Sequence, residues 1–186
     1  MMGADTHQME TTMTARTTTR RLSAVAGGAA ALLLAASTSG ATAPTRARGA
    51  GELRNLLPAT TQPTDHGTAQ VTALEAGGQT TVTLKVQGLD HDLAGTVLGA
   101  HVHTGSCIAG DGAAAGPHYN AGGGISDETE VWLDFTVEAN GTGRASTTVP
   151  FTVAAGAAGS VVIHAQPTDH GTGAAGPRWA CLPVEF

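Results

Sequence analysis

The stretch from residue 70 to residue 86 constrains the fold most, because apolar and polar side chains alternate along it with a period of two. Gln70–Glu75 reads Gln-Val-Thr-Ala-Leu-Glu, and Thr80–Val86 reads Thr-Thr-Val-Thr-Leu-Lys-Val. Alternation rich in β-branched residues predicts half-buried strands, and Gly77-Gly78 between the two segments predicts a hairpin turn. An antiparallel β-sheet is therefore expected in this part of the chain.

Short segments of the same kind follow, with turn residues between them and no convincing amphipathic helix. Strands are expected over residues 97–103, 130–137, 143–152, 160–165 and 179–186. Asn140-Gly141 predicts a second hairpin, and the Gly-, Ala- and Pro-rich residues 104–124 predict a long loop. With 26 glycines and only 3% aromatic residues, the core should consist mainly of Val, Leu, Ile and Ala. These features predict an all-β fold, an antiparallel sandwich or barrel.

The start of the chain has the pattern of a targeting segment, and residues 1–41 are predicted to be a signal peptide. Arg20-Arg21 precede the apolar run Ala24–Ala36, and Ser39-Gly40-Ala41 offers a small-residue cleavage site. Met13 is an alternative start, and the arginine pair is only a thin match to a twin-arginine signal. Residues 42–65 are interpreted as a linker. The protein is expected to be exported, to the extracellular space or the cell envelope.

Charge and hydropathy argue against a nucleic-acid partner and against a membrane-spanning segment. The formal net charge is −6, and the sequence contains no basic patch, so a nucleic-acid partner has no electrostatic footprint. The apolar run near the start is too short to cross a bilayer, and no other stretch is long enough. We therefore expect no integral membrane segment in the mature protein.

Two cysteines occur, Cys107 and Cys181, and both lie in the region of predicted strands. In an exported chain, a pair separated by most of the fold is more typical of a disulfide than of two free thiols. Two buried apolar thiols are the alternative.

Four histidines are candidates for metal binding. His101 and His103 occupy alternate positions of a predicted strand, so both imidazoles should project from one face. His118 lies in the long loop, and His164 ends the apolar run Val161–Ile163. Polar residues on a solvent-facing sheet, or a histidine at a strand end, would look the same. If the four bind one ion, imidazoles without thiolates favour copper, zinc or nickel.

The heptapeptide Gln-Pro-Thr-Asp-His-Gly-Thr occurs twice, at residues 62–68 and 166–172. The sequences around the two copies do not match, so this is not the repeat of a solenoid. His66 and His170, which lie in the two copies, are interpreted as solvated turn histidines.

Several motifs together resemble the Cu/Zn superoxide dismutase family. They are Gly99-Ala-His-Val-His103, Thr104-Gly-Ser-Cys107, Ala115-Gly-Pro-His118, Val162-Ile-His164 and Gly176-Pro-Arg-Trp-Ala-Cys181. The resemblance covers residues from about 70 to the C-terminus and implies a Greek-key antiparallel β-sandwich or flattened barrel, which we place over residues 66–186. It also implies four copper ligands, a disulfide between the two cysteines, and an arginine beside the copper. These ligands are His101, His103, His118 and His164, and the arginine is Arg178.

The chain also departs from the family pattern. In the family, the histidine matched by His118 bridges copper and zinc, and two further histidines and an aspartate complete the zinc site. No histidine occurs between His118 and His164, and only Asp127, Glu128 and Glu130 offer anionic ligands before the strand expected to begin near Val131. One imidazole with loosely placed carboxylates is a poor structural zinc site. The interval from His164 to Arg178 is short, which is similar to the copper-only branch of exported bacterial members, so zinc is doubtful.

The implied reaction is the disproportionation of superoxide to oxygen and hydrogen peroxide. Arg178 would attract the anion, although a solvated arginine near the last strand is the plainer interpretation. The resemblance implies that His118 carries a proton to the departing peroxide. With no zinc on its second nitrogen, His118 needs another orienting group, and Glu130 is the first choice ahead of Asp127 and Glu128.

Two other functions are weighed against superoxide dismutation. They are a non-enzymatic copper-binding module and a structural domain with a decayed site.

Overall fold

The structure is a computed structural model that describes residues 46–57 and 60–186. The predicted signal peptide lies outside the described residues. Within those residues, no helix is long and apolar enough to cross a membrane.

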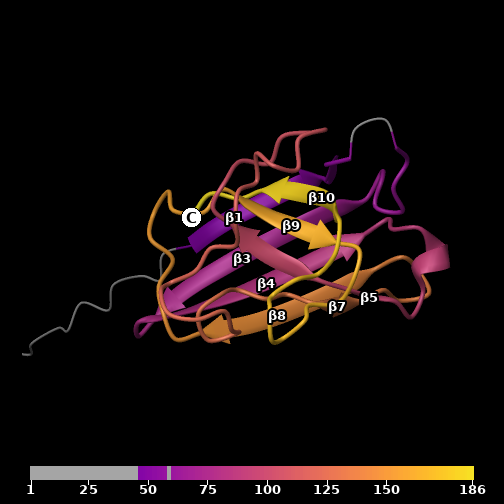
Figure 1. The fold of residues 1–186 in the computed structure, drawn as a ribbon. Helices are drawn as coiled ribbons and strands as arrows, with labels where there is room; N and C mark the ends of the chain where they lie inside the picture. Colours follow the sequence, from indigo (N-terminus) through magenta and orange to yellow (C-terminus); the bar gives the residue numbers. More distant parts are fainter. Residues whose placement is uncertain (1–45, 58–59) are drawn as a thin grey trace, which may run out of the picture. The chain divides into compact units, whose positions relative to one another are not determined.

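One four-stranded antiparallel sheet is built around the predicted hairpin, and its strand order is β1-β3-β4-β8 (Figure 1). Its strands are β1 (Arg46–Glu52), β3 (Thr68–Ala76), β4 (Gln79–Gln87) and β8 (Gly143–Val149). β3 and β4 pair along their full lengths, from Thr68↔Gln87 to Ala76↔Gln79. The turn between them holds Gly77 and Gly78 at φ of 60° and 79°, the left-handed conformation that a tight two-residue hairpin needs.

A second four-stranded sheet carries the candidate site, in the order β2-β10-β9-β6, and a two-stranded sheet joins β5 to β7. The second sheet consists of β2 (Arg54–Asn55), β6 (Ala100–His103), β9 (Ser160–His164) and β10 (Arg178–Pro183). The small sheet consists of β5 (Val97–Leu98) and β7 (Phe135–Thr136), and a short 3-10 helix, η1 (His91–Leu93), precedes it. All pairings are antiparallel.

The inward faces of the two large sheets share one hydrophobic core. Val82 and Leu84 of β4 are buried in the same cluster as Val102 of β6 and Ile163 of β9. The cluster consists largely of Val, Leu, Ala and Ile, as the composition indicates. The predicted all-β antiparallel sandwich is therefore confirmed.

The interpretation of residues 42–65 as a linker is wrong for much of its length, because β1 and β2 lie within it. β1 pairs with β3 over seven residues, from Arg46↔Leu74 to Glu52↔Thr68. Its inward positions are Ala47 and Gly49, and a Cβ on Gly49 would collide with the carbonyl oxygen of Pro183. Alternation that uses only alanine and glycine on the inner face gives almost no apolar signal, which is why the sequence pattern did not reveal the strand.

The second predicted hairpin is also wrong, although its turn is present. Gly141 has a φ of 74° and its N–H donates to the carbonyl of Glu138. The strands on either side of the turn belong to different sheets, because β7 pairs with β5 and β8 pairs with β4. The chain leaves the first sheet after β4 and returns to it beside β4 as β8. This crossing is the Greek-key element of the fold.

The long loop between β6 and β7 is attached to the second sheet by the disulfide Cys107–Cys181, with a Cα–Cα distance of 5.6 Å. Both cysteines are buried in a small cluster with Leu56, Ala115 and Val162. The loop that carries His118 is therefore held against β10 and β9.

Candidate metal centre

The second sheet and the long loop bring the four histidine rings together. His101 and His103 project from the same face of β6, as their spacing predicts, and His164 ends β9, which pairs with β6. His118 comes from the loop and forms a single β-bridge with His103. One nitrogen from each ring lies within 4.8 Å of the others. Among the described residues, this is the only such group of three or more His, Cys, Asp or Glu side chains.

Three of these rings are oriented by a hydrogen bond at Nδ1. Carbonyl and carboxylate oxygens can only accept hydrogen bonds, so each Nδ1 carries a proton, and in the neutral form of each ring the lone pair is on Nε2. The contacts are His103 Nδ1 to Gly116 O (3.0 Å), His164 Nδ1 to Gly176 O (3.2 Å) and His118 Nδ1 to Glu130 Oε2 (2.7 Å). The Nε2 atoms of His103 and His164 lie 3.4 Å apart.

His101 is oriented through its other ring nitrogen, Nε2. Its Nε2 lies 2.7 Å from Thr168 Oγ1, and its Nδ1 is buried with no hydrogen-bond partner in the structure. A buried polar nitrogen without a partner costs free energy, and a cation bound to the lone pairs of the four rings would remove that cost. The donor set therefore fits one metal ion held by Nδ1 of His101 and by Nε2 of the other three histidines.

The three most buried rings are kept neutral. Burial lowers the pKa of His101 to about 2, of His103 to about 3 and of His164 to about 4, and the positive charge of Arg178 acts in the same direction. A neutral imidazole has the lone pair that a metal ion needs. At neutral pH, these side chains are therefore ready to act as ligands without first losing a proton.

The lowered pKa values predict that the metal-free chain is destabilised by acid. The unfolded histidines take up protons below about pH 6.5, whereas the folded ones stay neutral down to between pH 4 and 2. The unfolded state therefore binds more protons in this interval, and the free energy of unfolding falls as the pH falls, by up to about 1.4 kcal/mol per pH unit for each ring. Urea unfolding of the metal-free chain at pH 7.5, 5.5 and 4.5 measures this, and an unchanged midpoint would contradict it. A His66→Asn variant should show the same loss, because His66 is exposed.

Glu130 lies behind His118, and it is buried although it is a carboxylate. Besides the contact to His118, it accepts hydrogen bonds from Trp132 Nε1 (2.9 Å) and Asn120 Nδ2 (3.2 Å). Burial raises the pKa of Glu130, but the hydrogen bonds from Trp132, His118 and Asn120 together bring it below its ordinary value. The structure thus puts an ionised carboxylate on the outer nitrogen of His118. Asp127 and Glu128, the other candidates, are exposed.

Arg178 begins β10 and pairs with His164 across the ladder to β9. Its Nη1 donates to the carbonyl oxygen of Gly112 at 2.7 Å. Burial lowers the pKa of the guanidinium, which nevertheless stays protonated, as arginine does in proteins. Among the described residues, no carboxylate forms an ion pair with it. A cation without an ionic partner therefore lies beside the histidine cluster.

Two residues near the cluster were not identified by the sequence reasoning, Thr168 and Asp134. Thr168 belongs to the second heptapeptide, and Asp134 contacts it. His170 of the same heptapeptide is exposed but packs edge-on against Trp132, with ring centroids 5.3 Å apart. His66 in the first copy is an exposed turn residue with a φ of 66°. The repeated heptapeptide was the one signal that could have pointed to Thr168.

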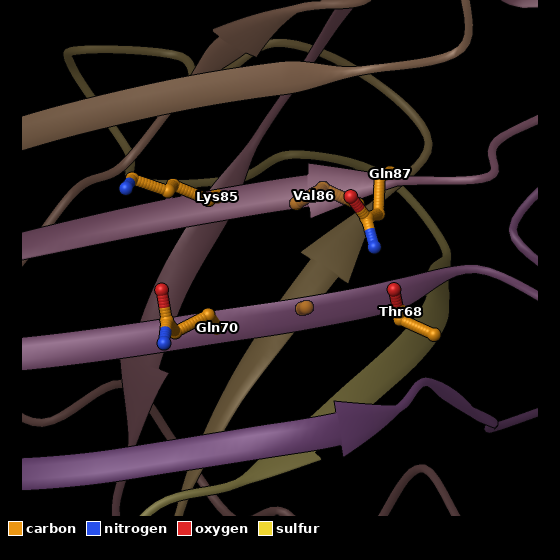
Figure 2. Close-up of a pocket in the computed structure, with 6 residues that line it drawn as sticks. Thr68, Gln70, Lys85, Val86 and Gln87 are labelled. Carbon is orange, nitrogen blue, oxygen red and sulfur yellow. The ribbon is translucent and has the colours of Figure 1, made fainter.

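The cluster is distinct from the shallow pocket on the solvent-facing side of the β3–β4 hairpin. Thr68, Gln70, Lys85 and Gln87 line that pocket (Figure 2), and none of the four histidines does. The chemistry of the protein is therefore expected at the second sheet and its loops.

Comparison with known proteins agrees with this geometry. The family model for copper/zinc superoxide dismutase (SODC) matches residues 65–182. The matched span contains the four histidines, both cysteines, Glu130 and Arg178. No curated protein matches the chain.

Proposed function

The chain belongs to the copper/zinc superoxide dismutase family, and we propose on this premise that it is an exported copper-dependent superoxide dismutase. The observation that carries the proposal is the convergence of four imidazole nitrogens within 4.8 Å, each ring oriented by a partner on its other nitrogen. Imidazole ligands without thiolates suit copper. Bound copper would supply the one-electron oxidation and reduction that convert two superoxide ions and two protons into oxygen and hydrogen peroxide.

We further propose that the protein works without zinc. In the family, the second metal binds the outer nitrogen of the bridging histidine. In this chain, Glu130 Oε2 lies 2.7 Å from that nitrogen of His118, so a zinc ion there would have to displace a buried carboxylate held by Trp132 and Asn120. Glu130 would take over the orienting role of zinc.

The remaining roles fall to Arg178 and His118. The protein carries a net charge of −6 and its substrate is an anion, so local positive charge is needed to attract it. The unpaired guanidinium of Arg178 beside His164 provides that charge and can hold the anion by charge-assisted hydrogen bonds. His118 is the least buried of the four ligands, and we propose that its Nε2 delivers a proton to the product.

The test is a dismutation assay on the purified chain after loading with copper, with bound metals counted. We expect about one copper per chain, essentially no zinc, and rapid dismutation. Arg178→Ala should lower the rate about tenfold at low ionic strength and flatten its salt dependence, whereas Arg144→Ala, at an exposed position of β8, should not. Copper binding without dismutation would support the rival copper-binding module, and stoichiometric zinc would overturn the copper-only proposal.

The role of Glu130 leads to a separate prediction. Glu130→Gln keeps the shape of the side chain but replaces one acceptor oxygen with a donor amide, which weakens the hold on His118 Nδ1–H. Turnover should fall about tenfold or more while copper content stays nearly unchanged. Glu128→Gln is the matched control, because Glu128 lies in the same loop and is exposed. Full activity of Glu130→Gln across the pH range would show that another group orients His118.

A further inference from the structure

The two copies of the heptapeptide Gln-Pro-Thr-Asp-His-Gly-Thr have different surroundings. In each copy the threonine at the third position is buried, with exposed fractions of 1% for Thr64 and 6% for Thr168. The hydroxyl of Thr64 has no hydrogen-bond partner in the structure. The hydroxyl of Thr168 has two partners, one of them a ligand of the proposed copper site.

Thr168 lies between His101 and Asp134. Its Oγ1 is 2.7 Å from His101 Nε2 and 2.5 Å from Asp134 Oδ1. Its backbone N–H donates to the other carboxylate oxygen, Asp134 Oδ2, at 2.7 Å. Ala100, the residue before His101 in β6, approaches Asp134 Oδ1 with its N–H at 3.4 Å. The carboxylate is thus held by the strand that carries His101 and by the loop that carries Thr168.

The direction of the hydrogen bonds follows from the donors available. A hydroxyl has one proton and a carboxylate has none to give, so Thr168 donates to Asp134 and must accept from His101. His101 therefore carries its proton on Nε2 and has a bare Nδ1. That is the opposite tautomer from the other three ligands. It leaves the lone pair on Nδ1 of His101, the buried nitrogen without a hydrogen-bond partner, available to a metal ion at the centre of the cluster.

The loop that carries Thr168 is short and firmly attached. Gln166 accepts a hydrogen bond from the N–H of Gly99 at 2.8 Å and donates its own N–H to Ala175 at 3.0 Å. The carboxylate of Asp169 caps the turn by accepting from the N–H groups of Gly171 and Thr172 at 3.0 and 2.8 Å. These contacts fix the position of the Thr168 hydroxyl relative to β6.

We propose that Thr168 and Asp134 are positioning residues that set the tautomer and orientation of His101 for metal binding. The proposal rests on the proposed copper site, and it gives the second heptapeptide a role that the first copy lacks. Groups that hydrogen-bond to the ring nitrogen that does not bind the metal raise metal affinity, because they fix the orientation and tautomer of the ring before the metal binds.

The test compares Thr168→Val, Thr168→Ser and Thr64→Val in the full chain, using Cu(II) ions and a competing chelator. Thr168→Val replaces the hydroxyl with a methyl group of similar size and should weaken copper binding about 10- to 100-fold and change the Cu(II) electron paramagnetic resonance spectrum. Thr168→Ser should restore both properties to near the unmodified chain. Thr64→Val removes the partnerless hydroxyl of the same heptapeptide and should leave both unchanged. Unaltered affinity and spectrum in Thr168→Val would overturn the proposal.

A second measurement separates this proposal from the copper proposal. The ¹⁵N chemical shifts of the His101 ring in the metal-free chain report its tautomer directly. We expect the Nε2–H form in the unmodified chain and a population of the Nδ1–H form in Thr168→Val. An Nδ1–H ring in the unmodified chain would overturn the role of Thr168, whether or not copper binds. A chain that shows the expected tautomer but binds no copper would overturn the proposed function instead.

Discussion

Replacing His103 by glutamine is expected to lower copper affinity by at least about a hundredfold and to abolish dismutation. His103 is completely buried, and its Nε2 lies 3.4 Å from that of His164, at the centre of the cluster. Glutamine fills much of the same volume but offers no imidazole nitrogen, so three ligands would remain. Loss of an outer partner alone costs 10- to 100-fold in metal affinity, and loss of a direct ligand should cost more.

The measurement is the number of copper ions per chain, together with chelator competition. His66→Asn is the control, because His66 is exposed and asparagine tolerates the left-handed backbone found there. It should bind copper like the unmodified chain. Unchanged copper affinity in His103→Gln would mean that the metal does not bind at the histidine cluster.

Removing the disulfide is expected to cost about 4 kcal/mol of the free energy of unfolding. Cys107 and Cys181 are 74 residues apart in sequence, and cross-linking so long a segment restricts the unfolded chain strongly. Alanine at both positions avoids placing hydroxyls in the buried cluster around Leu56 and Val162. Copper affinity should fall as well, because the bridge ties the loop of His118 to β10.

Urea unfolding of the double variant Cys107→Ala, Cys181→Ala measures the loss. The unmodified chain treated with a reductant should reach the same stability, which separates the cross-link from the side-chain change. The disulfide would have no such role if the double variant and the oxidised chain unfolded at the same urea concentration. The carbonyl of Cys107 accepts a hydrogen bond from Arg54 at 2.7 Å, and this backbone contact should survive in the variant.

Local patterns in the sequence were sufficient where structure depends on neighbouring residues. The alternation over residues 70–86 with Gly77-Gly78 predicted the β3–β4 hairpin, because strand faces and turn conformations are set within a few residues. The same rule placed His101 and His103 on one face of β6. It failed for β1, whose inner face is made of alanine and glycine, and for the partner of β8, which lies far away in the sequence.

By itself, the sequence determined the all-β class and the four imidazole side chains, and the resemblance of its motifs indicated the family. The tertiary structure decided which nitrogen of each ring faces the centre, because loops bring the partners of the other nitrogen to the rings. These partners are Gly116, Glu130, Thr168 and Gly176, and of them only Glu130 was expected from the sequence. The two heptapeptides show the limit most directly. Their seven residues are identical, yet Thr64 is left without a partner while Thr168 joins Asp134 to His101. The difference lies in the strands packed against each copy, and no local pattern contains that information.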